Sequence, residues 1–478
     1  MSIKIYNSLT RSKQAFQTVS ANQVRMYCCG ITVYDYCHLG HARTCLVWDI
    51  VRSYLEWSGY EVNYIQNFTD IDDKILNRAK KEGVSMSDIS ERYIDAYFED
   101  MERLRIRPAN DYPRATCTVD GIKNLVAELE EKGFAYAAAG DVYYSVDKFS
   151  EYGKLSGRKL EDMQTGASGR VGDSEATKKQ NPCDFALWKA AKEGEPSWDS
   201  PWGKGRPGWH IECSAMVREK LGETIDIHMG GSDLAFPHHE NEIAQSEAAN
   251  GKQLANYWMH NGMVKVEGEK MSKSLGNFTT IRELLDSGVE PMAVRLFILQ
   301  AQYRKPVDFT DDAIAAATNG WETLKEGLLF GQKFGAKLGF SDSVDTSKEI
   351  KQKFQTAVDD DFNFAGGLAV LFEIAKELRK EGNLIVHGGQ PTGKAEQLAI
   401  DWHTLVELAG VMGFHAELAE VAESESTGLS DTEIDSLVKQ RAAAKKAKNW
   451  AESDRIRDEL KDQGITLIDT KEGTTWHR

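Results

Sequence analysis

The sequence predicts an α/β protein in which a parallel sheet, interrupted by an insertion, precedes a helical region and a small C-terminal unit. Three observations support this class. Two apolar strands flank a helical pattern near the N-terminus, polar Gly-rich sequence interrupts the middle, and helical periodicity dominates the second half. At 478 residues, the chain is expected to form about three domains.

The N-terminal region contains the clearest fold signal. A buried strand is predicted from Val24 to Cys29, and Val62–Phe68 is predicted as a second strand. Between them a helix begins near Gly40, because apolar residues recur at helical spacing: Leu46, Val47, Ile50, Val51 and Leu55. A strand, a helix and a strand in this order form the βαβ unit of a parallel sheet.

The middle of the chain interrupts this pattern. A hairpin is predicted around Ala139-Gly140-Asp141, and a polar, Gly-rich loop from Thr165 to Asn181. We interpret this part as an insertion between two halves of a nucleotide-binding fold, which resumes with a strand at Thr224–His228. A capping box, Ser85-Met86-Ser87-Asp88, is expected to begin a helix that reaches Leu104.

Helical periodicity then prevails. Helices are predicted at Pro291–Gln302, Ala313–Phe330, Phe354–Arg379 and Trp402–Met412, and Ser430-Asp431-Thr432-Glu433 is a second capping box. The predicted divisions are 1–112 and 203–265 for the two halves of the sheet domain, 113–202 for the insertion, 266–330 for a lysine-containing loop and its surroundings, 331–421 for a helical bundle, and 429–478 for the C-terminal unit.

Charge and cysteine content limit the possible functions. The net charge of −16 argues against an indiscriminate nucleic-acid binder, although RNA recognition depends on the local field. Glu417–Val438 has seven acidic and no basic residues, whereas Lys439–Asn449 has five basic and no acidic residues. The basic segment is either a solvated amphipathic helix or a helix that faces phosphates.

Neither a signal-peptide core nor a membrane-spanning apolar run is apparent. The seven cysteines lack a disulfide-like rhythm, which favours a reducing, cytoplasmic location.

A first chemical motif is His38-Leu39-Gly40-His41. Histidines three residues apart share a helix face. Amide groups at a helix N-terminus favour an anion such as a triphosphate, and Gly40 would let an adenine ring approach the backbone. Structural histidines, or a nucleotidyltransferase of another kind, would explain the motif equally well.

A second motif is Lys270-Met271-Ser272-Lys273-Ser274. Its two ammonium groups could meet charge that develops on a phosphate during transfer. The alternative is an ordinary pair of surface lysines.

Cysteine, histidine and glutamate residues suggest a metal site. His238 and Glu242 are four residues apart and share a helix face, and Cys213 with one of Cys28 and Cys29 would complete a tetrahedral zinc set. Adjacent strand residues point to opposite faces, so only one of the two neighbouring cysteines can bind. A zinc ion that only braces the fold is the alternative, although such mixed ligand sets are less typical of structural sites.

The histidine motif followed by the lysine motif resembles the class I aminoacyl-tRNA synthetases, and the metal set narrows the resemblance to cysteinyl-tRNA synthetases. The resemblance implies a Rossmann-like catalytic domain and a C-terminal anticodon-binding unit. It implies that L-cysteine is activated by ATP and transferred to tRNA(Cys). The family places its first metal ligand directly before a glycine, which selects Cys29 and leaves Cys28 in the core.

The resemblance also assigns residues. The metal ligands are Cys29, Cys213, His238 and Glu242. The catalytic residues are His38, His41, Lys270 and Lys273. ATP-binding residues are His38, Gly40, His41, Gly231, Asp233 and Lys273, with Lys273 the principal contact. The amino-acid pocket contains Gly30, Thr69, Trp209 and His228, and the anticodon contacts are Trp450, Asp454, Asp469 and Trp476.

We therefore expect a monomer without membrane association that holds one Zn²⁺ per subunit and uses Mg²⁺ with ATP. The insertion is expected not to be an editing domain. Two alternatives are a ligase that joins cysteine to a small amine on the same scaffold, as in mycothiol biosynthesis, and a non-catalytic RNA-binding paralogue. Ligases for small amines lack the C-terminal unit that is predicted here. The intact nucleotide motifs argue against a non-catalytic paralogue.

Overall fold

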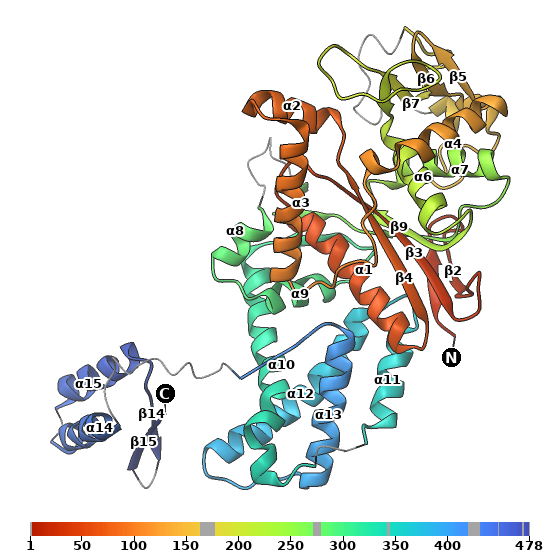
Figure 1. Ribbon diagram of the computed structural model, residues 1–478. Helices are drawn as coiled ribbons and strands as arrows, with labels where there is room; N and C mark the ends of the chain where they lie inside the picture. Colours follow the sequence, from red (N-terminus) through yellow and green to blue (C-terminus); the bar gives the residue numbers. More distant parts are fainter. Residues whose placement is uncertain are drawn as a thin grey trace.

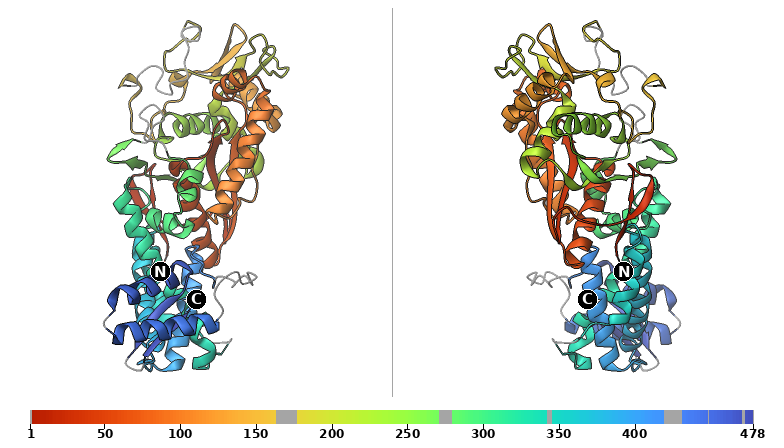
Figure 2. Two further views of the ribbon diagram at one scale, coloured as in Figure 1. Left: turned by 90° about the vertical axis from the view of Figure 1, so that its left-hand side faces the viewer. Right: turned by 90° about the vertical axis from the view of Figure 1, so that its right-hand side faces the viewer.

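The computed structural model describes residues 2–162, 177–270, 279–341, 345–418, 431–447, 449–470 and 473–477. The molecule is elongated. A region built on a parallel sheet lies between the inserted region and a bundle of helices, and a small C-terminal unit lies beside the bundle (Figures 1 and 2).

A four-stranded parallel sheet in the order β10-β9-β3-β4 forms the centre of the first region. Its strands are β3 (Gln23–Thr32), β4 (Glu61–Thr69), β9 (Ile225–Gly231) and β10 (Ala255–Asn261). The helix α1 (Leu39–Trp57) joins β3 to β4, and α7 (Glu240–Asn250) lies between β9 and β10. The predicted βαβ unit and parallel sheet are confirmed.

The strand order determines where a ligand can bind. The chain leaves β3 towards β4 on one side, and leaves β9 towards β10 on the other. Open α/β sheets bind ligands at such a switch point, beyond the carboxyl ends of the strands. Cys29 and Gly30 lie near the end of β3 and Gly231 ends β9, so several predicted site residues lie at this position.

The insertion forms its own antiparallel sheet in the order β5-β6-β7-β8, preceded by α4 (Val119–Glu131). Ala139 and Gly140, both with positive φ (52° and 84°), form the turn between the first two strands, which confirms the predicted hairpin. The strands are β5 (Ala135–Ala138), β6 (Asp141–Tyr144), β7 (Phe185–Ala190) and β8 (Gly205–Pro207). The expected boundary at residue 202 therefore falls inside this sheet, which then leads into α6 (Trp209–Lys220).

Smaller elements complete this part. Ser85 and Asp88 form the predicted capping box at the start of α3 (Met86–Arg103). The remaining strands are β1 (Lys4–Asn7), β2 (Ser12–Ala15), β11 (Val264–Val266), β12 (Glu269–Lys270) and β13 (Val307–Phe309), and the remaining helices are α2 (Asp73–Glu82) and α8 (Ile281–Asp286). Short helical turns are η1 (Ala115–Cys117), η2 (Val146–Lys148), η3 (Leu160–Asp162) and η4 (Ala235–His239).

The helical region differs from the prediction at one break and at some helix ends: the helix predicted to end at Phe330 continues to Leu338, and the one predicted from Trp402 begins at Ala395. The single helix expected at Phe354–Arg379 is two helices, because Asp361 and Phe362 have positive φ values of 65° and 49°. The buried Asp361 carboxylate accepts hydrogen bonds from the Tyr6 amide and the Tyr303 hydroxyl, and these contacts hold the break. The helices are α9 (Pro291–Leu299), α10 (Asp311–Leu338), α11 (Lys348–Val358), α12 (Phe364–Val386) and α13 (Ala395–Val411).

The C-terminal unit has a separate small core that includes Ile434, Ile456 and Leu460. It contains the helices α14 (Asp431–Lys446) and α15 (Trp450–Asp462) and the hairpin of β14 (Thr466–Thr470) and β15 (Gly473–His477). Ser430, the first residue of the second predicted capping box, lies outside the described residues.

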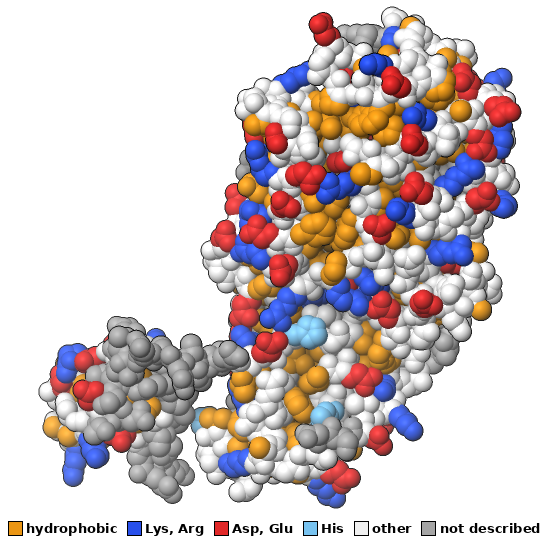
Figure 3. Space-filling view, viewed as in Figure 1, with side chains coloured by type: hydrophobic (Ala, Val, Ile, Leu, Met, Phe, Trp, Pro, Cys, Tyr) orange, Lys and Arg blue, Asp and Glu red, His pale blue; other side chains and the backbone are white. Residues whose placement is uncertain are grey.

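On the face in Figure 3, acidic and basic side chains are interspersed over the main body, so no field of one sign covers it. Among the described residues, no helix combines the length and apolarity needed to cross a bilayer.

Candidate metal centre and nucleotide site

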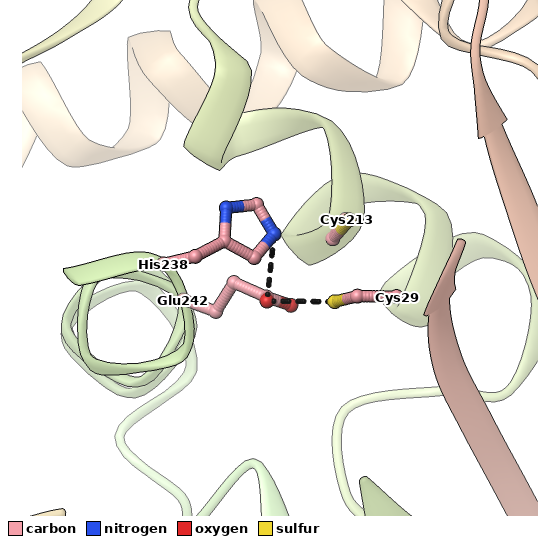
Figure 4. Close-up of side chains that lie close together, drawn as sticks. All are labelled: Cys29, Cys213, His238 and Glu242. Carbon is pink, nitrogen blue, oxygen red and sulfur yellow. Dashed lines mark hydrogen bonds and ion pairs between the residues drawn. The ribbon is translucent and has the colours of Figure 1, made fainter. Parts of the chain in front are cut away.

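The four predicted metal ligands lie together, although they come from four separate elements. Cys29 is on β3, Cys213 on α6, His238 on η4 and Glu242 on α7. Their ligand atoms all lie within 4.8 Å of one another, and all four residues are buried. In Figure 4, His238 and Glu242 project from one helical segment, and both cysteines face them.

Two short contacts define the centre of this cluster. The Cys29 thiol donates to Glu242 Oε1 at 3.1 Å, and His238 Nε2 lies 3.2 Å from the same oxygen (Figure 4). A position surrounded by two sulfurs, an imidazole nitrogen and a carboxylate oxygen matches the ligand types that zinc prefers. The residues present therefore fit a zinc ion.

The two adjacent cysteines lie on opposite sides of the sheet. Cys29 packs with Cys213, whereas Cys28 belongs to the large core and lies near Cys45. The glycine that follows allows β3 and β4 to approach closely, because a Cβ on Gly30 would lie 1.7 Å from the carbonyl oxygen of Asn67. The Gly30 amide donates to the Asn67 side chain at 2.8 Å.

The electrostatics of the cluster favour a cation. Burial raises the pKa of the Cys29 thiol, and the neighbouring Cys213 and Glu242 raise it further. A hydrogen bond from Cys29 lowers the pKa of Cys213, but burial and the charge of Glu242 raise it overall. Burial opposes ionisation of Glu242, yet His228 and His238 hold its pKa below its usual value. Two neutral thiols beside a carboxylate would become thiolates if a divalent cation were bound.

Other side chains hold these ligands in place. His228 Nε2 lies 2.9 Å from Glu242 Oε2, and its ring stacks on Trp258 with a centroid distance of 4.3 Å. His210 Nδ1 lies 3.1 Å from His238 Nδ1, which leaves Nε2 of His238 directed at Glu242. Outer contacts of this kind orient metal ligands and tune their basicity.

The predicted pocket residues surround the same cluster. Trp209 packs against the His238 ring at a centroid distance of 4.3 Å. Thr69, at the end of β4, donates from its hydroxyl to the buried Glu212 carboxylate at 2.9 Å. The assignment of Thr69 and Trp209, with His228 and Gly30, to an amino-acid pocket stays a prediction.

His239 and Glu240 are the nearest competitors for a metal, and a regular helix would turn both away from the ligands. The structure turns only Glu240 away, since Nε2 of His239 lies 4.0 Å from Glu242 Oε1. The reason is that Phe236 has extended backbone angles (φ −141°, ψ 133°), so the segment is not a regular helix. Glu240 does face away, because its carboxylate accepts hydrogen bonds from the backbone of the insertion.

Sequence reasoning did not identify His210, His239 or His260 as part of this site. His239 Nδ1 lies 2.9 Å from His260 Nε2, and His260 Nδ1 lies 2.8 Å from the Ser8 hydroxyl. Cys29, His228 and His239 also form a second group of close potential ligands. Only the adjacency of His239 to His238 and of His210 to Trp209 could have drawn attention to them.

The histidine motif begins α1. His38 is the N-cap residue, and its Nδ1 accepts hydrogen bonds from the amides of Gly40 and His41 at 3.0 and 3.3 Å. The His38 amide in turn donates to His41 Nδ1 at 3.3 Å, and the two rings stack at 3.7 Å. The first helix amides are therefore bonded to His38 rather than open to an anion, which corrects that expectation.

Both imidazoles are neutral at pH 7. Burial lowers the pKa of His38 to about 4, partly opposed by Asp233, and burial followed by His38 and Lys74 lowers the pKa of His41. Because both Nδ1 atoms accept hydrogen bonds, each ring carries its proton on Nε2, the atom that can donate to a phosphate.

Two glycines of the predicted nucleotide site have steric roles in the chain itself. A Cβ on Gly40 would lie 2.7 Å from Cε1 of His38, and a Cβ on Gly231 would lie 2.6 Å from Oδ1 of Asp233. Each glycine therefore makes room for a predicted ligand-binding side chain. Asp233 is exposed and accessible to a ligand. Lys270 ends β12, and Lys273 lies outside the described residues.

The four predicted anticodon residues lie in the C-terminal unit. Trp450 begins α15 and is 60% exposed, and Asp454 lies 3.1 Å from Arg457 in an ion pair. Trp476 donates from Nε1 to Asp435 at 2.7 Å, and Asp469 pairs with Thr474 in the hairpin register. Among the described residues of this unit, no contact distinguishes an RNA surface, so these assignments stay predictions.

Comparison with known families identifies the chain's relatives. Residues 15–319 match the family described as tRNA synthetases class I (C) catalytic domain. Residues 353–417 match the DALR domain, and 427–476 match the cysteinyl-tRNA ligase anticodon binding domain. A cysteine–tRNA ligase of Rippkaea orientalis is 69% identical over the whole of both chains.

The chain belongs to the cysteine–tRNA ligase family. Another member, from Microcystis aeruginosa, is 66% identical over 100% of this chain and 99% of its own length. The predicted family resemblance is thereby confirmed. A ligase for small amines is not favoured, because the family's C-terminal domain is present.

Solved structures with low sequence identity share the class I fold with this cysteine–tRNA ligase family member. Mycobacterium tuberculosis methionyl-tRNA synthetase in complex with methionyl-adenylate aligns with a TM-score of 0.57 at 15% identity, over 82% of this chain and 89% of that chain. A ternary complex of Agrobacterium radiobacter LeuRS with tRNA and LeuAMS aligns with a TM-score of 0.58 at 13% identity, over 84% and 87% of the two chains.

Proposed function

We propose that this chain activates L-cysteine with ATP, transfers the cysteinyl group to tRNA(Cys), and selects cysteine through a zinc ion held by Cys29, Cys213, His238 and Glu242. The buried cluster of these four ligands, within 4.8 Å of one another, is the observation that carries the proposal. One ion per subunit follows from the one cluster of four ligands found among the described residues.

Selection against serine explains why such a site is useful. Serine differs from cysteine by one atom, and the shape of a pocket is worth only about 1–3 kcal/mol for differences of this size. A bound zinc ion would supply a Lewis acid that lowers the pKa of the substrate thiol and accepts its thiolate. A hydroxyl stays protonated and is a poorer partner for a sulfur-rich site.

The activation step needs no protein nucleophile. The cysteine carboxylate attacks the α-phosphorus of ATP, an acyl–phosphate bond forms, and the bond to pyrophosphate breaks. His38 and His41, neutral with protons on Nε2, donate to phosphate oxygens, and Asp233 accepts from the ribose hydroxyls. Lys273 supplies positive charge from the lysine motif, and Mg²⁺ enters with ATP.

In the transfer step, a hydroxyl of the terminal tRNA ribose attacks the cysteinyl carbonyl and AMP leaves. The C-terminal unit binds the anticodon through Trp450, Asp454, Asp469 and Trp476. Zinc-based selection needs no second hydrolytic site, so the insertion at about 113–202 is not an editing domain. The protein acts as a monomer in the cytoplasm, where its seven free cysteines stay reduced.

Cysteine-dependent exchange of pyrophosphate into ATP tests the activation step. We expect exchange with the native protein, loss after chelation, and recovery with zinc alone, in parallel with one zinc per chain by elemental analysis. Unchanged selection of cysteine over serine in zinc-free protein would contradict the assigned role of the metal.

Charging of tRNA with a GCA anticodon tests the transfer step. Replacing Trp450 by alanine is expected to raise the KM for tRNA and leave pyrophosphate exchange unchanged, since the side chain is exposed and distant in sequence from the catalytic domain. Val19→Ala, another exposed apolar residue, is the matched control and should alter neither.

A further inference from the structure

Arg43 is a fully buried arginine on α1, two residues after His41. Its guanidinium does not pair with a carboxylate in any contact that the structure gives. It donates instead to three backbone carbonyls: Met263 at 2.9 Å, Tyr303 at 3.0 Å, and Lys305. The side chain therefore connects the helix of the histidine motif to a distant part of the chain.

The three carbonyls flank the base of a small sheet. Met263 directly precedes β11, and Lys305 lies shortly before β13, its parallel neighbour. The Met263 carbonyl also accepts the Val307 amide at 3.1 Å, which closes this end of the sheet. β11 pairs with β12, whose last residue is Lys270, the first lysine of the second nucleotide motif.

Gly262 lies at the same junction, where the segment before β11 meets the segment before β13. Its amide donates to the Tyr303 carbonyl at 2.8 Å. A Cβ at this position would lie 2.4 Å from the carbonyl oxygen of Lys305, so the two backbone segments touch directly. Any side chain at Gly262 would push these segments apart.

The chemistry of Arg43 suits this role. Burial lowers its pKa to about 10, so it is still charged at neutral pH. A planar guanidinium can serve several carbonyls at fixed angles, whereas a lysine ammonium is a single point of charge on a flexible stem. Lysine at this position would keep the charge and lose the fixed geometry.

We propose that Arg43 is a positioning residue that sets the base of the β11–β12 hairpin against α1, and so fixes the distance between the histidine motif and the start of the lysine motif. The inference rests on the proposed function, because both motifs are assigned to ATP. Arg43 should affect the use of ATP and not the binding of cysteine, because the candidate metal ligands make no contact with this junction in the described structure.

Kinetics of pyrophosphate exchange test the inference. In Arg43→Lys we expect kcat/KM for ATP to fall by at least about tenfold, because displacements near 1 Å at a reacting centre cost about a hundredfold. The KM for cysteine and the zinc content should not change. Gly262→Ala pushes the same two segments apart, so it should also lower kcat/KM for ATP and leave the KM for cysteine and the zinc content unchanged.

Arg295→Lys is the matched control. Arg295 is also fully buried and donates to the carbonyls of Leu104, Arg105 and Met412, but it lies at a junction away from the hairpin. Its lysine variant should lose similar stability and keep its kcat/KM for ATP. An equal ATP defect in Arg295→Lys, or none in Arg43→Lys, would overturn the proposal.

Hydrogen exchange separates this inference from the proposed function. The amides of Val264–Glu269 should exchange faster in Arg43→Lys than in the native protein, and not in Arg295→Lys. Failure of native protein to catalyse cysteine-dependent exchange would refute the proposed function alone. Unchanged protection of these amides in Arg43→Lys would refute the positioning role alone.

Discussion

The metal cluster is buried and the histidine motif is partly buried, and the two sites also differ in how their polar groups are satisfied. His38 and His41 bond to the first amides of their own helix and to each other's backbone. In the metal cluster, two thiols and a carboxylate face one another. Burial, Cys213 and Glu242 raise the pKa of the Cys29 thiol, and, although a hydrogen bond from Cys29 lowers the pKa of Cys213, burial and Glu242 raise it overall. The polar groups of the histidine motif are bonded within the chain, whereas the facing thiols and carboxylate of the metal cluster fit a cation.

The largest expected effect comes from removing one sulfur. Cys29→Ser should lower zinc affinity by more than about a hundredfold. Mutating a residue that only contacts a metal ligand already lowers metal affinity or activity by about 10–100-fold, and Cys29 is itself a ligand in the proposal. Cysteine-dependent exchange should be lost with the metal. Elemental analysis and exchange assays measure both effects.

Cys28→Ser is the control for this change. The two cysteines are adjacent, but Cys28 lies in the core on the other face of the sheet. We expect this variant to lose about 1–3 kcal/mol of unfolding free energy, from a buried hydroxyl, and to keep its zinc. Loss of zinc in Cys28→Ser alone would reverse the assignment of the first ligand.

The next largest effect is expected from His38, which is both the N-cap of α1 and, in the proposal, a hydrogen-bond donor to phosphate. Asparagine is a good N-cap residue, so His38→Asn should keep the start of α1 but lose the Nε2 donor. We expect the rate of cysteine activation to fall by about 10²–10³-fold with little change in thermal stability. Zinc content serves as the control. A fall in zinc content would show that the two sites are not independent.

The pH dependence of stability provides a third test. The pKa of His38 is about 4 in the folded protein, below the ordinary 6.5, so its contribution is fully present above pH 6.5 and is lost as the pH falls towards 4. Over this range, chelated native protein should lose about 2–3 kcal/mol more unfolding free energy than chelated His38→Asn. Denaturant titrations at several pH values measure the difference, and parallel curves would contradict a buried neutral imidazole.

The smallest effect is expected from Gly40→Ala. Its Cβ would lie 2.7 Å from Cε1 of His38 and displace that ring, while alanine favours the helix by about 1 kcal/mol. Stability should therefore change little, and cysteine activation should fall by about tenfold through the displaced donor. Full activity would show that the ring can move without consequence.

The sequence predicted the parallel sheet, and the pairing of His238 with Glu242, from local periodicity, whereas adding Cys29 and Cys213 to the metal set needed the family resemblance. Apolar spacing defined α1 between two strands, and residues four apart placed His238 and Glu242 on one side. Choosing Cys29 over Cys28 needed the family pattern, since alternation along a strand shows only that the two side chains point to opposite faces of the sheet.

What the sequence could not show depends on distant contacts. The break between α11 and α12 is held by Asp361, whose partners Tyr6 and Tyr303 lie in other parts of the chain. His260 likewise joins the site through its contact with His239, which connects β10 to η4. Neither contact leaves a spacing pattern in the sequence.

The Glu240 carboxylate has a consequence for attempts to shorten this enzyme. It is fully buried on the helix that carries Glu242, and its oxygens accept the amides of Gly153, Leu155 and Ser156. Excising the insertion would leave a buried carboxyl group without its hydrogen-bond partners, next to the candidate metal ligand Glu242. A minimal catalytic fragment must therefore retain the segment around residues 153–156, whatever else is trimmed.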